Sequence, residues 1–555
     1  MQVYMKTNKY IKALLPVLFL ASCSAMDEMV PEGSTITSDQ VQNTTSAIPD
    51  RSEADVAGIY SYAGQPFAVL GASQGAHNDF GYPSICMAQD SNGPDMVCSN
   101  SGYNWFSVSY DYSDRQYNYI VCYLRYSFFY NQIKLCNDVL APFAGMDYSA
   151  QAAESRHAIG QALAVRAFDY LGLAPYYQFR YADSKDLPCV PIVSETMTQE
   201  EYTDNPRASV ETVYKKIIGD LTTAIELLAD YSRGSDKTKV DRQVAYGLRA
   251  RAYLSMGMYA EAAADAEMAM DGYTPYSMTE VGRPAFCNLT DHNWMWGILQ
   301  ESDQQGGLIS WPSHLGSFTA VGYTTGTGVY KRINPLLYDK ISDTDVRKGW
   351  WTNDRNTSPL LDEIEWNGVT GAAIATLEIP DVEVAFQNYT VVKFGMKSGI
   401  GSTDNASDWP IMRAEEMILT QAEGLAMSGH ESEARQILEN FVRTYRDPEY
   451  VCEATEATAL QNEIWKQRRI ELWGEGFSMF DIMRLKKPVV RIHGNSIGSW
   501  PNAYAFNIAP DDPYLLLRFP QQETNTNKGV SSLDNSGGSA PKPMQNGNLL
   551  DGVTD

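Results

Sequence analysis

The sequence contains few of the residues that bind metals or build redox centres. Six histidines are scattered along 555 residues, and none stands in an H-E-x-x-H pattern. The eight cysteines include no C-x-x-C pair, so neither a zinc ribbon nor a dithiol redox motif is present. The sequence also has no phosphate loop and no dinucleotide fingerprint. We therefore expect no metal, no cofactor and no catalytic site of these classes.

Basic residues are outnumbered by acidic ones. Lys and Arg total 43 against 68 Asp and Glu, which gives a formal net charge of −25. A chain this acidic repels phosphate backbones and anionic membrane surfaces, so nucleic acid is a poor partner. The 44% of hydrophobic residues still indicates a globular fold. Aromatic residues, mostly Tyr, make up 11% and suit both cores and amphipathic binding surfaces.

The sequence has no apolar run that is long enough to span a bilayer. A short apolar segment at residues 13–20 follows three lysines, which is the pattern of a secretory signal. Leu-Ala-Ser directly before Cys23 resembles the lipobox of bacterial lipoproteins, where the signal is cut before the cysteine and the cysteine is acylated. We predict a signal peptide at 1–22, lipidation of Cys23 and a lipid-anchored tether over 23–50. Ordinary secretion with a chance cysteine is the alternative.

The other cysteines give little support for disulfides. Seven remain besides the predicted lipidation site, so at least one thiol stays free. Cys122 and Cys136 fall within a helix expected at 116–140, where they would lie about 21 Å apart, too far for a disulfide. Cys86 and Cys98 remain open as a pair. Buried free thiols are the alternative for all of them.

Apolar residues recur with helical spacing through the N-terminal half. One stripe contains Ile159, Leu163 and Tyr170, with Arg166 inside it. After Ser209, which is the expected N-cap, the same pattern returns. These patterns predict helices over 52–62, 116–140, 210–228 and 241–256.

Two glycine turns share the same neighbours. Gly257 and Gly429 each have small or apolar residues at positions −7, −3, +5 and +9. Small residues there let two antiparallel helices pack closely, as in tetratricopeptide hairpins. Because the turns are far apart in sequence, the repeat is not a contiguous solenoid. We predict a mainly α fold, with a tetratricopeptide-like helical hairpin scaffold and a loop-rich, partly β subdomain.

The predicted regions follow from these patterns. The segment 63–115 is irregular but rich in aromatic residues, which favours a functional loop over disorder. Alternating strand-like runs occur near 293–299 and 389–394. The regions are an N-terminal helical part at 51–271 that contains the loop 63–115, a variable loop and strand subdomain at 272–408, C-terminal hairpins at 409–487 and a loop-rich end at 488–555.

Two acidic residues in the C-terminal hairpins invite a catalytic interpretation. Glu471 and Glu475 stand four residues apart, and paired carboxylates can hydrolyse glycosides. Opposite charges at helical spacing favour a structural role instead. In that interpretation three arginines neutralise three acids between packed helices: Arg468, Arg469 and Arg484 for Glu471, Glu475 and Asp481.

A second catalytic pattern occurs at residues 494–498, which match G-x-S-x-G. A nucleophile elbow needs a helix directly after the serine. Ser499-Trp-Pro-Asn follows here, so we interpret the match as chance. Catalysis therefore has no positive support in the sequence.

Several specific motifs are found along the mature chain. They are Ala164-x-Arg166-Ala167-Phe168-x-Tyr170-Leu171, Arg207-x-Ser209, Ala250-Arg251-x-Tyr253-Leu254, Arg413-x-x-Glu416…Ala422-Glu423, Arg468-Arg469-x-Glu471-Leu472-x-Gly474-Glu475-Gly476…Asp481-x-x-Arg484 and Arg518-Phe519-Pro520…Glu523…Asn527. Together they resemble the SusD/RagB family of nutrient-binding surface lipoproteins. Phe477 replaces the arginine that is usual in the family after the Glu-Gly pair.

The resemblance implies a helical scaffold, anchored by lipid at the cell surface, that docks on a SusC-like TonB-dependent outer-membrane transporter. It implies a lid over that barrel, with the ligand held between the two proteins and no catalysis. The usual ligands of such proteins are oligosaccharides, and peptides are the minority case. A peptide-binding or chiefly gating subunit is therefore the alternative to a glycan-binding protein.

Glycan binding needs exposed aromatic rings and polar groups that bond to hydroxyls. Two segments supply both, one within 63–115 and one at 303–323, and they correspond in order to the family's ligand-facing loops. For any single aromatic residue, packing in the core is the alternative. The predicted ligand-facing residues are Asp79, Tyr82, Asp95, Tyr103, Trp105, Trp311, His314 and Tyr323.

Overall fold

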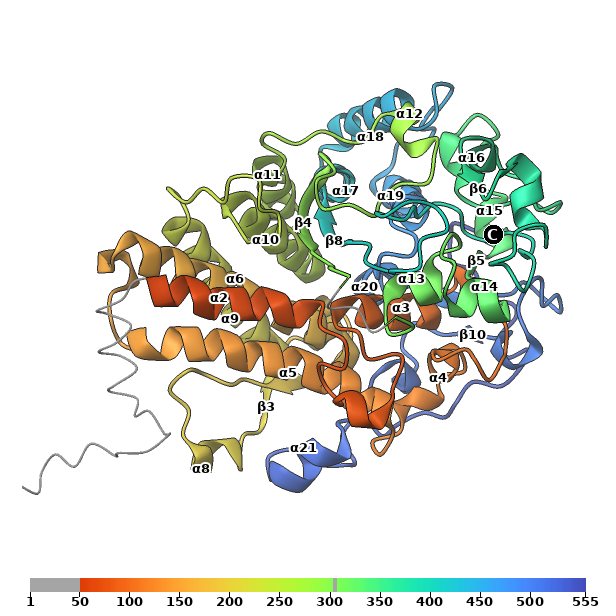
Figure 1. The fold of residues 1–555 in the computed structure, drawn as a ribbon. Coiled ribbons are helices and arrows are strands. Elements are labelled where there is room, and N and C mark those ends of the chain that lie inside the picture. The colour runs from red at the N-terminus through yellow and green to blue at the C-terminus, as the bar shows by residue number, and fades with distance from the viewer. Residues whose placement is uncertain (1–49, 303–306) are drawn as a thin grey trace, which may run out of the picture. The chain divides into compact units, whose positions relative to one another are not determined.

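Helices provide the scaffold in the computed structural model, which describes residues 50–302 and 307–555. The predicted signal peptide, Cys23 and nearly all of the tether lie outside the described residues. The N-terminal half contains α2 (Asp50–Ala63), α5 (Ile120–Leu140), α6 (Ala153–Tyr177), α9 (Val210–Leu227), α10 (Arg242–Met256) and α11 (Tyr259–Ala269). In Figure 1 these helices lie alongside one another, with α6 packed against α2, α5 and α9. The helices predicted from periodicity are confirmed.

Each of the two glycine turns joins the two helices of a hairpin, as predicted. Gly257 ends α10 with a φ of 75° and leads into α11. Gly429, with a φ of 88°, lies between α17 (Ala414–Met427) and α18 (Glu431–Tyr445). The hairpins pack together through α11 and α17. A side chain at Gly424 would come within 2.5 Å of the Tyr259 carbonyl oxygen, so the close approach requires a small residue there.

The C-terminal hairpin segment begins with a strand, which the sequence did not indicate. β8 (Trp409–Arg413) pairs antiparallel with β4 (Trp294–Ile298), and every residue of both strands is buried. Burial on both faces removes the alternation by which a strand is recognised. The region predicted as a strand at 389–394 contributes only isolated bridges, such as that between Trp351 and Val391.

The remaining elements are short. The other strands form two-stranded antiparallel pairs: β1 (Met96–Val97) with β5 (Arg332–Ile333), β2 (Pro188–Pro191) with β3 (Arg207–Ser209), β6 (Glu365–Trp366) with β7 (Val369–Thr370), and β9 (Val489–Val490) with β10 (Asn507–Ile508). The other helices are α3 (Tyr82–Asn92), α4 (Ser107–Tyr110), α7 (Tyr181–Ser184), α8 (Gln199–Tyr202), α12 (Met278–Val281), α13 (Trp311–Leu315), α14 (Tyr323–Thr327), α15 (Pro335–Tyr338), α16 (Pro359–Asp362), α19 (Ala457–Glu471), α20 (Ser478–Leu485) and α21 (Gln521–Thr526).

Helix α3 corrects the prediction that residues 63–115 are irregular throughout. All its residues from Pro83 to Asn92 are buried, so no amphipathic period marks it in the sequence. Two of its polar side chains, Asp90 and Asn92, are bonded inside the protein. Asp90 accepts hydrogen bonds from the backbone of Gly476 and Ser478 at 3.0 and 3.2 Å. The helix is therefore a central element rather than part of a surface loop.

Arg491 supports the C-terminal end of α3. Its guanidinium donates to the carbonyl oxygens of Ser91 and Asn92, at 2.9 and 3.1 Å, and to that of Gly93 at 3.2 Å. Burial lowers the pKa of Arg491 to about 10. A cation at the carbonyl end of a helix compensates the partial negative charge there.

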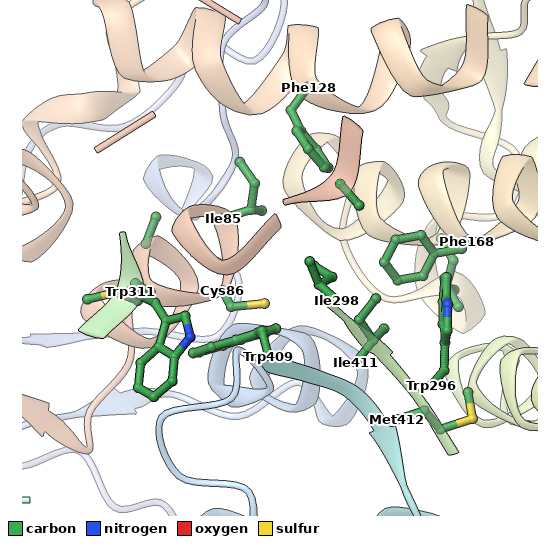
Figure 2. Packing of buried hydrophobic residues seen from close by; sticks show 14 of the residues in the cluster. Ile85, Cys86, Phe128, Phe168, Trp296, Ile298, Trp311, Trp409, Ile411 and Met412 are labelled. Atoms are coloured by element: carbon green, nitrogen blue, oxygen red, sulfur yellow. The ribbon is translucent and has the colours of Figure 1, made fainter. Parts of the chain in front are cut away.

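The main hydrophobic core lies where α3 meets β4 and β8. Figure 2 shows Cys86 of α3 beside Trp409 of β8, with Trp311 next to it. The rings of Trp311 and Trp409 lie 5.5 Å apart at an interplanar angle of 63°. Cys86 is a free thiol, as are all seven cysteines of the described residues, and Cys122 and Cys136 share α5 as expected.

A buried charge cluster fixes the C-terminal hairpins to the subdomain. Its four bases are Arg347, Lys393, Arg413 and Arg446, and its four acids are Asp345, Glu415, Glu471 and Glu475. The Glu471 carboxylate accepts from Arg446 at 2.8 Å and from Arg413 at 3.0 Å. Burial alone would raise the pKa of Glu471, but Arg446, Arg413 and Arg347 hold this pKa well below its usual range.

The structural interpretation of these acids is confirmed, but only one of the three, Asp481, is neutralised by the predicted arginines. Arg468 and Arg484 pair with Asp481 as expected, at 2.9 and 2.8 Å. Glu471 and Glu475 are neutralised instead by the basic residues of the buried charge cluster, which come from distant segments. Helix α19 ends at Glu471, so the two glutamates do not share a helix.

Ser496 of the G-x-S-x-G match stands in a tight turn. His493 and Ser496 form an isolated bridge, and the next element is a short 3-10 helix at Asn502–Tyr504. The strand-turn-helix context of a nucleophile elbow is therefore missing at this serine.

Glu471→Gln should lower the free energy of unfolding by about 3–5 kcal/mol, because it leaves three buried guanidiniums without their shared carboxylate. Urea unfolding measures the change. Asp138→Asn is the matched control, since the Lys134–Asp138 pair is exposed and should change stability by less than about 0.5 kcal/mol. Equal effects of the two substitutions would contradict the structural role of the cluster.

Candidate ligand-binding site

The two predicted ligand loops meet at a group of aromatic and imidazole rings. The Tyr323 hydroxyl and His77 Nδ1 lie 2.6 Å apart in a hydrogen bond. His314 Nε2 lies 2.9 Å from the His77 carbonyl oxygen. These contacts span more than two hundred residues of sequence, so residues near 77 and residues near 320 form one surface.

Trp105 completes this group by stacking on His77. The two ring centroids are 4.8 Å apart and the planes are nearly parallel, at 10°. The Trp105 ring also meets Tyr323 edge to face at 6.5 Å. Stacked and edge-to-face rings of this kind stabilise one another by about 0.5–1.5 kcal/mol per pair. The indole is therefore held in one orientation before any ligand arrives.

A short turn presents Trp105 at the surface. Its neighbour Asn104 is buried and donates from its amide to the Ser99 carbonyl oxygen at 3.2 Å, while its Oδ1 accepts from the Phe106 backbone. Phe106 is buried and packs edge to face on His314 at 5.5 Å. Asn104 and Phe106 are buried, whereas Tyr103 is exposed and Trp105 is half-buried.

The outer part of this group is open to solvent. Tyr103 is 59% exposed and Trp105 and His77 are half-buried, whereas only 8% of Tyr323 is exposed. We call Tyr103, Trp105, His77 and Tyr323 the aromatic platform. An exposed tyrosine next to a half-exposed indole is an amphipathic surface, and it can accept the apolar face of a ring-shaped ligand.

The imidazoles of this region carry no charge at neutral pH. Burial lowers the pKa of His314 to about 3, and the nearby Lys331 ammonium acts in the same direction. Burial also lowers the pKa of His77 from its usual value. The platform is therefore an uncharged surface that favours stacking and hydrogen bonds over ion pairing.

The two predicted acidic ligand residues are bound inside the protein. Asp79 accepts the Leu70 backbone N–H at 2.8 Å, and burial raises its pKa. Asp95 is held by Arg469 through two bonds of 2.7 and 2.9 Å. Both side chains are almost fully buried, so each fastens a loop and neither lies on the surface of the platform.

Three of the predicted ring residues also lie in the interior. Trp311 is 2% exposed and donates from Nε1 to the Ser407 carbonyl oxygen at 2.7 Å, within the core cluster of Figure 2. Tyr82 is half-buried, with its ring against Phe168 at 4.9 Å. His314 is fully buried beneath Tyr323. Of the eight predicted residues, Tyr103, Trp105 and Tyr323 belong to the platform.

His77 was not among the predicted ligand residues, although it lies at the centre of the platform. The signal in the sequence is only local: His77 stands two residues before Asp79, in a segment that also contains Phe80 and Tyr82. Its contact with Tyr323 depends on the fold and has no sequence signature.

In residues 50–302 and 307–555 there is no group of three or more His, Cys, Asp or Glu that could hold a metal ion. The platform contains no carboxylate and no activated nucleophile.

In residues 50–302 and 307–555, none of the helices has the length and apolar character needed to cross a membrane.

Family models match most of the described chain. The model described as the SusD family matches residues 195–537. A second model, described as starch-binding and associating with the outer membrane, matches residues 71–254. No curated protein sequence matches the chain.

Solved structures share the fold over nearly their whole length. A SusD-like carbohydrate-binding protein from Bacteroides vulgatus has a TM-score of 0.70 and 24% identity, covering 87% of this chain and 97% of that one. A SusD superfamily protein from Bacteroides thetaiotaomicron has a TM-score of 0.68 and 18% identity, covering 87% and 98%. A laminarin-binding SusD-like protein has a TM-score of 0.59 and 18% identity, covering 86% and 98%. At these identities the likeness shows the mainly α fold.

The neutral state of His314 makes a prediction about pH. Its pKa is about 3 in the folded protein and about 6.5 when unfolded, so the folded state binds fewer protons and loses stability as pH falls below about 6.5. Between pH 7.5 and pH 5 this loss amounts to about 2 kcal/mol. His314→Gln removes it. In urea unfolding, the difference in unfolding free energy between the wild type and His314→Gln should shrink by this amount from pH 7.5 to pH 5. Parallel pH profiles of the two proteins would contradict the prediction.

Proposed function

Because the chain belongs to the SusD family, we propose that it is a cell-surface lipoprotein that captures oligosaccharides and delivers them to a SusC-like TonB-dependent outer-membrane transporter. The family membership rests on the model that matches residues 195–537. The ligand class rests on the aromatic platform, together with the starch-binding description of the model at residues 71–254.

The observation that carries the proposal is the stack of Trp105 on His77 with Tyr103 exposed beside it. Sugar rings have an apolar face of C–H groups that packs on aromatic rings, and hydroxyls at the edge that need polar partners. The same turn supplies donors in the amide N–H groups of Asn100 and the O–H of Ser101, while the Asn100 Oδ1 accepts from Tyr504 and the Ser101 Oγ from the Tyr103 backbone. Preorganised rings reduce the entropy lost on binding.

Binding without catalysis is supported by the state of the acidic residues. Glu471 and Glu475, the pair that could have suggested glycoside hydrolysis, are buried and bonded to several cations. A general acid for that reaction needs a raised pKa and access to substrate. The pKa values of both carboxyls are lowered because, although burial opposes it, the surrounding cations favour the charged form.

Attachment to the outer membrane is supported by the N-terminal sequence. A short signal followed by Leu-Ala-Ser-Cys is the pattern by which bacterial lipoproteins receive their acyl chains. A lipid anchor on a long polar tether would keep the binding domain near a barrel partner in the same membrane, which raises their effective concentration. The family model described as associating with the outer membrane agrees with this placement.

Trp105→Ala and Tyr103→Ala should each weaken oligosaccharide binding about tenfold or more, because each removes an exposed ring of the platform. A glycan array identifies the ligand and calorimetry measures the affinity. Tyr202→Ala is the matched control, since Tyr202 is 37% exposed on α8, apart from the platform. Equal affinity in all three variants would reject this surface as the site.

A glycan array without hits, together with co-purification of a barrel protein, would point to the alternative. The protein would then bind peptides or act chiefly as the lid of the transporter. Release of sugar from a polysaccharide would contradict the proposal of binding without catalysis.

Cys23→Ala should abolish acylation and release the protein from the outer membrane, since Cys23 is the predicted acyl acceptor. Metabolic labelling with radioactive palmitate and fractionation of the cell envelope measure the two effects. Ser22→Ala, which keeps a small residue before the cysteine, is the control and should retain label. Retained label in Cys23→Ala would overturn the lipoprotein assignment.

A further inference from the structure

A cleft that is separate from the aromatic platform lies in the subdomain at 272–408. Its volume is about 760 Å³, and its walls come from α15, α16 and a 3-10 helix at Val346–Trp350. None of its lining residues belongs to the platform. Figure 1 draws α12 and α16 above α13 and α14, which contain Trp311 and Tyr323. Sites for small ligands span about 300–1,000 Å³, so this cleft has the size of a binding site.

The lining of the cleft combines apolar and polar side chains, and its two aromatic residues, Tyr338 and Trp351, are largely buried. Tyr338 lines it and packs edge to face on Tyr389 at 5.2 Å. The Lys348 ammonium lies 5.4 Å from the centre of the Tyr338 ring and pairs with the exposed Asp343. Threonine, serine and asparagine side chains occupy other parts of the wall. A surface that combines a ring with donors and acceptors fits a polyhydroxylated ligand.

Trp351 also lines the cleft. Its side chain, including Nε1, is fully buried, so it shapes the wall and presents no donor to the open space.

The charges of the cleft restrict the ligand further. Asp343 and Asp362 are exposed on its lining, and Asp362 forms no ion pair with a described residue. Lys348 is the only lining side chain of opposite charge in the described part of the cleft, and it is paired. Sugars that bear uronate or sulfate groups would be repelled. Neutral sugars offer hydroxyl donors to the carboxylates without that penalty.

We propose that this cleft is a second carbohydrate-binding site, which holds a neutral stretch of glycan while the aromatic platform holds another. The inference rests on the proposed function, because it assigns the same class of ligand to a new place. Two sites on one compact unit make the second binding event intramolecular for a chain that reaches both. Long glycans are then retained more tightly than short fragments.

Hydrogen exchange with mass spectrometry locates the two sites separately. The probes are malto-, laminari-, xylo- and mannohexaose, all neutral. In the wild type we expect protection near residues 77–105 and also across 338–362. In Trp105→Ala the cleft segment should remain protected by the same sugar. In Ala372→Trp, which fills the cleft, its protection should disappear while the platform keeps its own.

Leu377→Trp is the matched control, because Leu377 is 62% exposed and does not line the cleft. It should keep both protected segments. For a polymer of the sugar that binds, Ala372→Trp should raise the half-saturating concentration about tenfold or more, and Leu377→Trp should leave it unchanged.

The outcomes separate this inference from the proposed function. Protection of the platform alone, with every sugar, overturns the second site and leaves the proposed function intact. Loss of cleft protection in Trp105→Ala also overturns it, since the cleft would then not bind by itself. Absence of protection at the platform with every sugar contradicts the proposed function instead.

Discussion

The bidentate pairing of Arg413 with Glu475, in contact with Glu471, is the interaction on which the rest of the structure depends. Arg413 ends strand β8, which pairs with β4 of the subdomain, and Glu471 and Glu475 lie at and just after the end of α19. The pairing therefore ties the β4–β8 sheet to that helix. Charges buried this deeply are tolerated only when every partner is present. The pairing therefore demands one geometry of strand and helix, and the hydrophobic core assembles around it.

Internal polar contacts of the same kind leave the ligand surface free to vary. Asp95 is held by Arg469, and the end of α3 by Arg491, so the loop between them and Trp105 is anchored at its base. Tyr103 and Trp105, at the tip of the loop, do not anchor its base. Under the proposed function, scaffold and recognition are divided between neighbouring positions of one segment, so the proposed binding surface can change without loss of the fold.

Much of the fold could be predicted from the sequence because its signals are local. Helix α9 shows a regular apolar face and Ser209 caps it, and Gly257 marks a turn. Helix α3 and strand β8 were missed because burial on all sides removes their periodicity. In the sequence, a polar loop residue has the same signature whether its partner is water, a sugar or a remote arginine. For this reason the pattern that located the loops near Tyr103 and Tyr323 did not separate Trp105 from Asp95.

The bonds between Asp90 and the backbone near Gly476 join segments almost 400 residues apart. Helix α3 therefore has no complete set of partners until the last hairpin of the chain is available. Contacts of such long sequence separation make folding slow, because the chain loses the entropy of closing a long loop before the contact energy is gained. The loop that carries Tyr103 and Trp105 can therefore reach its final form only once nearly the whole polypeptide is available for folding.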